Sequence, residues 1–256
     1  MALPMRKLVL HTAVAAAVLL PAATGPAAAF DDAERKEIET IVRDYLLANP
    51  EVLLEVQQAL TAKQMAEQRD QQQKAIASKS DSIFGDSRDP VLGNPEGNVT
   101  IVEFFDYNCG YCKRALTDMV SMMEGDSELR FVLKEFPILG PESEEAHRVA
   151  FAFHDLHPDR YTEFHLRLLG GEGRANEESA MRIALDLGAD EAALRRQMED
   201  DSVIERIRDT YQLATELGIS GTPAYVIGDE VVSGALGEEV LATKVANVRE
   251  CGSTVC

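Results

Sequence analysis

The sequence predicts an α/β fold with an inserted all-helical subdomain, preceded by a separate N-terminal helical segment. Runs of β-branched and aromatic residues predict strands at 99–105 and 129–134, and two short runs at 223–227 and 230–232 flank a turn, as in a hairpin. Between these pairs, about 141–217 contains only helical segments separated by Gly, Pro, Asn and Asp. Strands on both sides of a helical block indicate a sheet core that carries a helical insertion.

Residues 1–29 have the pattern of a secretory signal peptide. Arg6 and Lys7 form a basic start, an apolar run follows from Leu8 to Leu20, and small residues end the segment at Ala29. The apolar run is shorter than the roughly 20 residues that span a bilayer as a helix. We therefore expect cleavage near Ala29 and export into an oxidising compartment, where disulfides persist. An uncleaved membrane anchor is the alternative.

Residues 30–60 form a helical segment with an apolar stripe at i, i+3, i+4, i+7 spacing. Asn49-Pro50 divides it into two helices, because the residue before Pro disfavours helical backbone. The N-terminal stripe consists of Ile38, Ile41, Val42, Tyr45, Leu46, Leu53, Val56 and Leu60. Two short helices form no stable core alone, so the stripe must pack on the α/β domain that follows or on other copies of the chain. Residues 61–80 are polar and Gln-rich, which predicts a long polar helix or a semi-flexible linker.

The net charge of the chain limits the kinds of molecule that it can bind. A net charge of −19 argues against nucleic acid and anionic lipid surfaces, because both attract basic patches. The part after the signal peptide is long enough for one large domain and an appendage. The chain has 4 cysteines, and their spacing decides what chemistry is available.

Two of the cysteines occur as Cys109-Gly110-Tyr111-Cys112, between the strand at 99–105 and a helix predicted to extend to about Met123. Residues at i and i+3 share one helical face, so the two sulfurs can bond to each other. Unpaired N–H groups and the macrodipole at a helix N-terminus stabilise a thiolate, and such sites lower a cysteine pKa to about 3.5–7.5. We expect Cys109 to be an exposed nucleophile and Cys112 a buried resolving thiol.

The same cysteines permit other interpretations. A zinc site needs a second ligand pair, and Cys251 and Cys256 do not have zinc-knuckle spacing. A purely structural Cys109–Cys112 disulfide closes too short a loop to stabilise much. Two thiols are also soft Cu(I) ligands, so a copper-binding module is an alternative. For Cys251 and Cys256 a local disulfide that holds the tail is the simplest prediction, and a redox relay or metal-binding tail remains open.

Three stretches carry a resemblance to a known family. The sequence "EFFDYNCGYCKR", the later "GISGTPAYVIGDEVVSGA" and the helical insertion resemble the DsbA-like branch of the thioredoxin superfamily over about 81–249. The stretch "YLLANPEVLLEVQQAL" resembles the leader of the ScsC-like proteins, the suppressor-of-copper-sensitivity group of bacterial periplasmic thiol oxidoreductases. The resemblance implies a periplasmic protein with a thioredoxin-like catalytic domain at 81–250 and a Cys-containing tail at 251–256.

The resemblance also assigns site residues. The nucleophilic and resolving cysteines correspond to Cys109 and Cys112, and the family's cis-proline corresponds to Pro223, preceded by Thr222. The resemblance implies that Thr222 offers backbone groups to an extended substrate segment. The dipeptide Gly110-Tyr111 resembles the periplasmic isomerase DsbC type, whereas the oxidising DsbA type usually carries Pro-His, and Thr before the cis-proline also resembles DsbC.

Glu103 lies six residues before Cys109 inside an apolar strand, so burial should raise its pKa. At this offset the superfamily has a buried acid, which implies a proton acceptor for the resolving thiol. The alternative is a strand carboxylate paired with Lys134 on the neighbouring strand. The histidines of the insertion are expected to be surface or core-edge residues and not metal ligands: His147, His154, His157 and His165.

The sequence and the resemblance together predict a periplasmic thiol–disulfide oxidoreductase, above all a disulfide isomerase for cysteine-containing exported proteins. It should need no organic cofactor and no metal, but it needs a membrane thiol reductase as electron donor. The resemblance to ScsC-like leaders implies a homo-oligomer, a trimer first and a dimer second. A monomeric DsbA-like dithiol oxidase and a copper-tolerance module are the alternatives.

Overall fold

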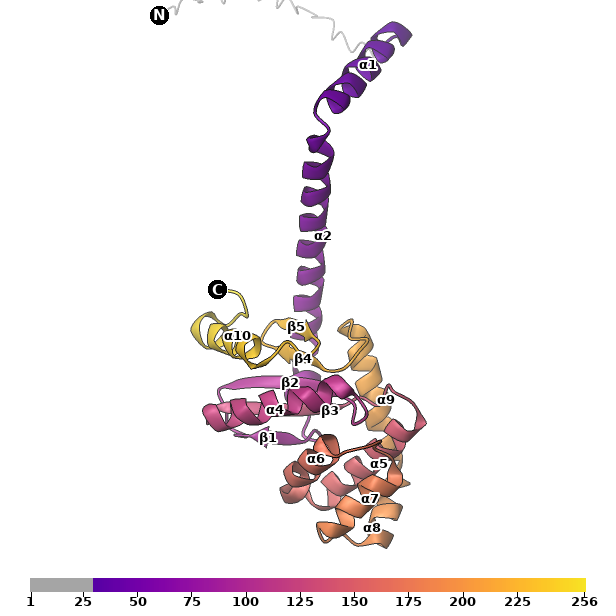
Figure 1. Ribbon diagram of the computed structural model, residues 1–256, viewed down its shortest axis with the longest axis vertical. Coiled ribbons are helices and arrows are strands. Elements are labelled where there is room, and N and C mark those ends of the chain that lie inside the picture. The colour runs from indigo at the N-terminus through magenta and orange to yellow at the C-terminus, as the bar shows by residue number, and fades with distance from the viewer. Residues whose placement is uncertain (1–29) are drawn as a thin grey trace, which may run out of the picture. The chain divides into compact units, whose positions relative to one another are not determined.

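The computed structural model describes residues 30–256, so the predicted signal peptide lies outside the described residues. The chain divides into two compact units, Met1–Leu60 and Thr61–Cys256. Figure 1 labels the strands and most of the helices. None of the described helices is both long and apolar enough to cross a membrane.

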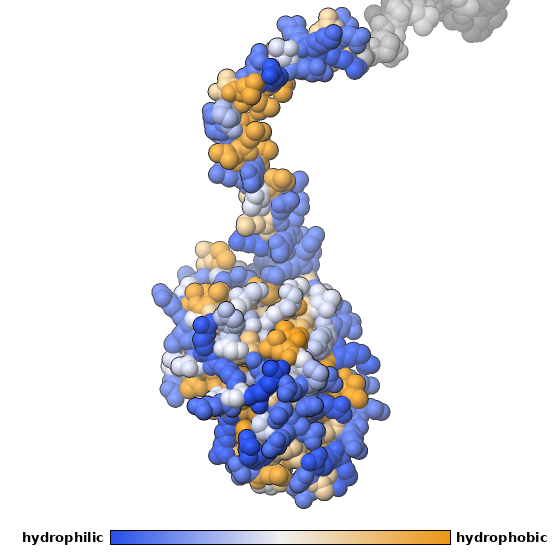
Figure 2. All heavy atoms as spheres, turned by 45° about the vertical axis from the view of Figure 1, so that its right-hand side comes forward, coloured by the Kyte–Doolittle hydropathy of each residue, from blue (hydrophilic) through white to orange (hydrophobic). Residues whose placement is uncertain are grey.

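The described part of the first unit is helical. Helix α1 spans Asp32–Ala48, and the capping box of Asp31 and Glu34 begins it, because each side chain accepts a hydrogen bond from the other's backbone N–H. Helix α2 begins at Glu51, after the predicted break at Asn49-Pro50. No residue from 30 to 60 is buried, and apolar side chains gather on this segment in Figure 2. The N-terminal stripe is therefore not covered within its own unit.

The core of the second unit is a five-stranded mixed sheet in the order β1-β3-β2-β4-β5 (Figure 1). Strands β2 and β3 are parallel, while β1–β3, β2–β4 and β4–β5 are antiparallel. The strand bounds are Val91–Gly93, Val99–Phe105, Leu129–Glu135, Ala224–Ile227 and Glu230–Ser233. This topology brings the carboxyl ends of β2 and β3 to the edge at which β4 begins. The first strand, β1, is short and was not predicted.

Most helices of the second unit belong to the predicted insertion. The insertion between β3 and β4 is all-helical, as the sequence predicts, and contains α5 to α9 with one 3-10 turn at Pro158–Arg160. Those helices are Pro141–Leu156, Tyr161–Gly170, Glu177–Asp186, Glu191–Met198 and Asp201–Glu216. The remaining helices are α3 at Ser80–Phe84, α4 at Gly110–Gly125 and α10 at Glu238–Cys251.

The alternation of side chains along β2 divides the core into two layers. Ile101 and Phe105 face α4, α10 and helices α5 to α8 of the insertion, whereas Val102 and Phe104 face α3, α9 and the end of α2. Both faces of the strand are buried, which explains its nearly continuous apolar sequence. The residues of β2 with odd numbers therefore lie on the α4 side of the sheet, and a polar residue among them is buried on that side.

The predicted polar helix or linker at 61–80 is mostly helical, since α2 continues to Ser78. Its end belongs to the core of the second unit: Ile76 is buried beside Ile83 of α3. Gln73 Nε2 also donates to Asp229 Oδ2 in the β4–β5 turn over 2.8 Å. The segment from Thr61 onward therefore contributes to the stability of the catalytic domain.

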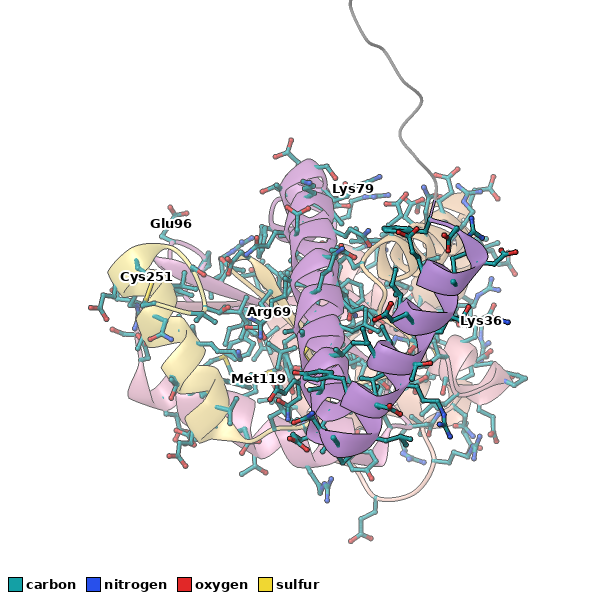
Figure 3. All side chains as sticks on the ribbon, turned by 90° about the horizontal axis from the view of Figure 1, so that it is seen from above. Lys36, Arg69, Lys79, Glu96, Met119 and Cys251 are labelled. Carbon is teal, nitrogen blue, oxygen red and sulfur yellow. A yellow bond between two sulfur atoms is a disulfide. The ribbon has the colours of Figure 1, made fainter. Side chains whose placement is uncertain are left out.

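The C-terminal tail is closed by a Cys251–Cys256 disulfide at the end of α10, which confirms the local pairing (Figure 3). The loop between these cysteines is held by Asp229, which accepts hydrogen bonds from Ser253 Oγ over 2.8 Å and from Thr254 N over 3.0 Å. The tail is thus fixed against the β4–β5 turn.

We expect Phe104→Ala to lower the free energy of unfolding by roughly 3–5 kcal/mol, since it leaves a cavity in the α9 layer. Phe104 is fully buried, whereas Ile204 on α9 is about half exposed and provides the control variant Ile204→Ala. Urea unfolding of both variants measures the difference. A loss below about 1 kcal/mol for Phe104→Ala would contradict the packing of this layer.

Candidate active site

The loop from Asp106 to Cys109 places the first cysteine at the N-terminus of α4. Asn108 N–H donates to Asp106 Oδ1 over 2.7 Å, and Cys109 N–H donates to Asp106 O over 2.9 Å, so the chain turns tightly after β2. Cys109 is the N-cap of α4, and its Sγ accepts the Cys112 N–H over 3.3 Å. The sulfur thereby takes the position of a capping side chain.

The two thiols differ strongly in acidity. A hydrogen bond from the Cys112 thiol, one with the Thr222 side chain, and backbone N–H groups lower the pKa of Cys109 to about 5, although burial opposes them. For Cys112, burial first and then the hydrogen bond to Cys109 raise the pKa far above its ordinary value. Cys109 is therefore a thiolate at neutral pH and Cys112 a thiol.

Cys109 is less accessible than the sequence led us to expect. The residue is only 5% exposed, so the prediction of an exposed nucleophile is wrong in the free protein. The reason is the loop before β4, since Cys109 Sγ lies 3.2 Å from Thr222 O. The peptide bond between Thr222 and Pro223 is cis, as predicted, and this loop forms one wall of the site.

Glu103 lies on the α4 side of β2, the side on which the two cysteines are buried. It is 1% exposed, and neither carboxylate oxygen has a hydrogen-bond partner among the described residues. Burial, and then the charge of Cys109, raise the pKa of Glu103 to about 8. Its charge in turn raises the pKa of Cys112, so the carboxyl and the buried thiol interact.

The alternative pairing of Glu103 with Lys134 is wrong. In the β2–β3 register, Lys134 lies opposite Phe104, one residue away, and its side chain projects from the other face of the sheet. There, Lys134 Nζ donates to Ser82 O over 2.6 Å and pairs with Asp89. A one-residue offset along a strand thus separates the two charges by the thickness of the sheet.

The dipeptide between the cysteines lies at the rim of the site. Tyr111 is 60% exposed, and the Arg114 guanidinium lies 4.4 Å from its ring centroid. Gly110 is exposed, and a Cβ at that position would meet no atom within 4 Å. Tyr111 thus offers an exposed aromatic surface between the two cysteines in the sequence.

Two of the four histidines of the insertion are not surface or core-edge residues. His147 and His165 are fully buried, because the insertion covers a polar network beneath the catalytic loop. His147 Nδ1 pairs with Glu135 Oε2 at 2.8 Å, and its Nε2 accepts Tyr107 N–H at 3.4 Å. His154 and His157 are partly exposed, as expected. Residues 30–256 contain no group of three or more His, Cys, Asp or Glu side chains that could hold a metal.

Sequence reasoning missed the residues that hold the catalytic loop from the insertion. Asn108, Asp106 and Ser143 form a hydrogen-bonded group directly beside Cys109. Only the polar character of Asn108 and Asp106 in an otherwise aromatic run could have signalled them. Their partner Ser143 lies in the insertion and has no signal in the sequence.

The fold and the Cys-x-x-Cys site define a thioredoxin-like protein, and comparison with known families identifies which family it is. The chain belongs to the DSBA-like thioredoxin domain family, whose family model matches residues 100–246. Residues 34–67 match a second family, described as the copper resistance protein ScsC N-terminal domain. Both matches confirm the resemblances found in the sequence, and each falls on the stretch that carried it.

Curated relatives match more than half of the chain. The thiol:disulfide interchange protein DsbA of Bordetella pertussis is 29% identical over 146 residues, which cover 54% of this chain and 68% of that protein. The Na⁺/H⁺ antiporter NhaA 1 of Salinispora arenicola is 26% identical over 162 residues, which cover 62% of this chain. The chain spans about a quarter of the length of these antiporters.

Solved structures have the same fold. A thioredoxin-like oxidoreductase from Silicibacter pomeroyi is 43% identical, with a TM-score of 0.64 over 67% of this chain and 98% of its own. The thiol-disulfide exchange protein alpha-DsbA2 from Wolbachia pipientis is 31% identical, with a TM-score of 0.65 over 70% and 97%. A linker-deletion variant of Proteus mirabilis ScsC is 28% identical, with a TM-score of 0.63 over 88% and 97%.

The thiolate of Cys109 should titrate with a midpoint near pH 5 in the reduced protein. Because its pKa is lowered on folding, it stabilises the reduced form above about pH 9, and this stabilisation is lost as the pH falls to about 5. Ultraviolet thiolate absorbance measures the midpoint, and Cys109→Ser should abolish the transition. A midpoint near 8.5, the value of a free cysteine, would contradict the capping role of the sulfur.

Glu103→Gln should stabilise the reduced protein, and only at higher pH. The raised pKa, about 8, means that ionising the buried carboxyl costs stability as the pH rises from about 4.5 to about 8, by up to about 5 kcal/mol. Urea unfolding at pH 5 and pH 9 measures this, with Glu124→Gln on the exposed side of α4 as control. Equal stability of wild type and Glu103→Gln at pH 9 would contradict an unpartnered buried carboxyl.

Proposed function

We propose that the protein is a thiol–disulfide oxidoreductase of the periplasm that acts mainly as a disulfide isomerase on cysteine-containing exported proteins. The observation that carries the proposal is the difference between the two thiols, since Cys109 has a pKa of about 5 and that of Cys112 is raised by burial. A nucleophile that is ionised beside a protonated resolving thiol can hold a mixed disulfide long enough for rearrangement.

The reaction begins when the Cys109 thiolate attacks one sulfur of a substrate disulfide. A Cys109–substrate disulfide forms, the substrate S–S bond breaks, and the second substrate sulfur leaves as a thiolate. The Cys112 N–H at 3.3 Å stabilises the attacking sulfur before the bond forms. The wall at Thr222 and Pro223 offers backbone groups to an extended substrate segment, and Tyr111 adds an exposed aromatic surface.

Two routes lead out of the mixed disulfide. In isomerisation another substrate thiolate attacks the substrate sulfur bonded to Cys109, which releases the Cys109 thiolate and a rearranged substrate with no net redox change. In reduction Cys112 attacks Cys109, which releases the reduced substrate and leaves a Cys109–Cys112 disulfide. That route requires two electrons and two protons from a membrane thiol reductase before the next cycle.

Glu103 is the proton acceptor for the second route. Cys112 must lose a proton before it attacks, and its raised pKa opposes this. Glu103 is the buried group whose charge acts on Cys112, and its own pKa of about 8 makes proton exchange possible near neutral pH. Its lack of a hydrogen-bond partner leaves both oxygens available for that proton.

The N-terminal segment joins copies of the chain into an oligomer, a trimer first and a dimer second. Its large apolar side chains are exposed, among them Ile41, Tyr45 and Leu54, which are each more than half exposed. Within this segment Ile38, Val42 and Leu46 line an apolar recess of about 530 Å³, a surface that a second amphipathic helix can fill. Several Cys109 sites around a shared space raise the effective concentration of a captured substrate and limit access by a membrane oxidase.

The oligomer hypothesis separates isomerase from oxidase in one experiment. Deleting residues 30–60 should give a folded monomer, because among residues 30–256 the buried core begins at Ile76, and α2 from Thr61 onward is kept. Full-length protein should reactivate a scrambled multi-disulfide protein, and the deletion variant should do so several-fold more slowly while it oxidises reduced substrates faster. Light scattering gives the mass of each form.

Cys109→Ser in the full-length chain is the control, since it should abolish both activities. A full-length protein that is monomeric, or a deletion variant that isomerises at the full rate, would refute the link between assembly and isomerisation. If the protein oxidises substrates efficiently and does not reactivate the scrambled protein in either form, it is a dithiol oxidase. Tight Cu(I) binding that requires Cys109 and is accompanied by neither activity would favour the copper module instead.

A further inference from the structure

The residue directly before the nucleophile is bonded to the helical insertion. Asn108 Oδ1 accepts Ala175 N–H over 2.8 Å, and Asn108 Nδ2 donates to Ala175 O and to Ser143 Oγ, each over 2.9 Å. Only one orientation of the amide meets both backbone groups of Ala175, so the assignment of its oxygen and nitrogen follows from the contacts. Both amide hydrogens and the amide oxygen are satisfied.

Three further hydrogen bonds join the insertion to residues around the site. Lys113, four residues after Cys109, donates from Nζ to Gly171 O over 2.8 Å and to Gly173 O over 3.1 Å. Ser143 Oγ donates to Asp106 Oδ1 over 2.8 Å. The catalytic loop and the first turn of α4 are thus held by the segment 171–175 and by the start of α5.

The two redox states of the site need these contacts to different degrees. In the oxidised protein a Cys109–Cys112 disulfide fixes the position of Cys109 covalently. In the reduced protein that bond is absent, and Cys109 Sγ stays 3.3 Å from the Cys112 N–H only if noncovalent contacts hold the preceding residue. Asn108 directly precedes Cys109, and its side-chain amide makes such contacts.

We propose that Asn108 is a positioning residue for the redox reaction, which holds the Cys109 sulfur at the N-terminus of α4 in the reduced state by bonding the catalytic loop to Ala175 and Ser143 of the insertion. It stabilises the reduced protein more than the oxidised protein and so raises the reduction potential of the pair. The proposal rests on Cys109 being the redox nucleophile, and it extends that assignment to the role of the insertion.

The test is the thiol–disulfide equilibrium of Asn108→Ala with reduced and oxidised glutathione. The equilibrium constant should shift about three- to tenfold toward the oxidised protein, as expected for the loss of one or two hydrogen bonds in one redox state. Urea unfolding of each redox form should show a larger loss for the reduced protein, and the thiolate midpoint of Cys109 should rise. Ser143→Ala removes one bond to Asn108 and should shift the equilibrium in the same direction by less.

Asn94→Ala is the matched control. Asn94 Nδ2 also donates to a backbone carbonyl, Ser127 O, over 2.9 Å, but at the end of the sheet where β2 and β3 begin, away from Cys109. Its loss should destabilise both redox forms equally and leave the equilibrium with glutathione unchanged.

An equal loss of stability in both redox forms of Asn108→Ala, with an unchanged equilibrium, would make Asn108 a structural residue only and overturn the proposal. A shift toward the reduced protein would overturn it as well. If Asn108→Ala does not fold, the Ser143→Ala equilibrium decides alone, and no shift there is a refutation. Failure of the wild type to exchange disulfides with glutathione at all would instead refute the proposed function.

Discussion

The hydrogen bond from the Cys112 N–H to the Cys109 sulfur is the interaction on which the rest of the site depends. It exists because the chain leaves β2, turns within Asp106 to Cys109, and begins α4 with a cysteine at the capping position. The first N–H groups of a helix have no partner within the helix, so they favour a negative charge at that point. The hydrogen bond from the Cys112 thiol and these N–H groups together lower the pKa of Cys109 to about 5.

The negative charge of this thiolate affects the protonation of the buried carboxyl of Glu103. Glu103 is buried on the same side of the sheet, and the charge of Cys109 raises its pKa further. Two negative charges in a poorly hydrated region repel each other, so the carboxyl favours its proton while Cys109 is ionised. Attack on a substrate removes the charge on Cys109, and Glu103 can then ionise more easily. The order of proton transfers thus follows from the electrostatics of one face of the sheet.

The insertion contributes to this site as well as covering the sheet. It supplies Ser143 and Ala175 to Asn108, and His147 beneath Tyr107, so the catalytic loop is bonded from a part of the chain that follows it by more than 30 residues. The opposite face of the sheet is packed by α3, α9 and the end of α2 and carries the Lys134–Asp89 pair. The N-terminal stripe has no such cover within its own unit, and an exposed apolar surface of this kind marks a site of association.

The sequence by itself determined the strands β2 to β5, the all-helical insertion between them and the position of Cys109 at a helix start, because local periodicity and short spacing encode these features. It also made a local Cys251–Cys256 disulfide the simplest prediction, whereas the short β1 and α3 have no clear local signal. Burial of Glu103 could also be predicted from its place in an apolar strand. Only the tertiary structure decided that Lys134 lies on the opposite face, because the offset between parallel strands sets which residues face each other. It also decided that Thr222 covers Cys109, that His147 and His165 are buried, and that Asn108 bonds to Ala175. These contacts join residues far apart in the chain, and the packing of the insertion on the sheet brings them together.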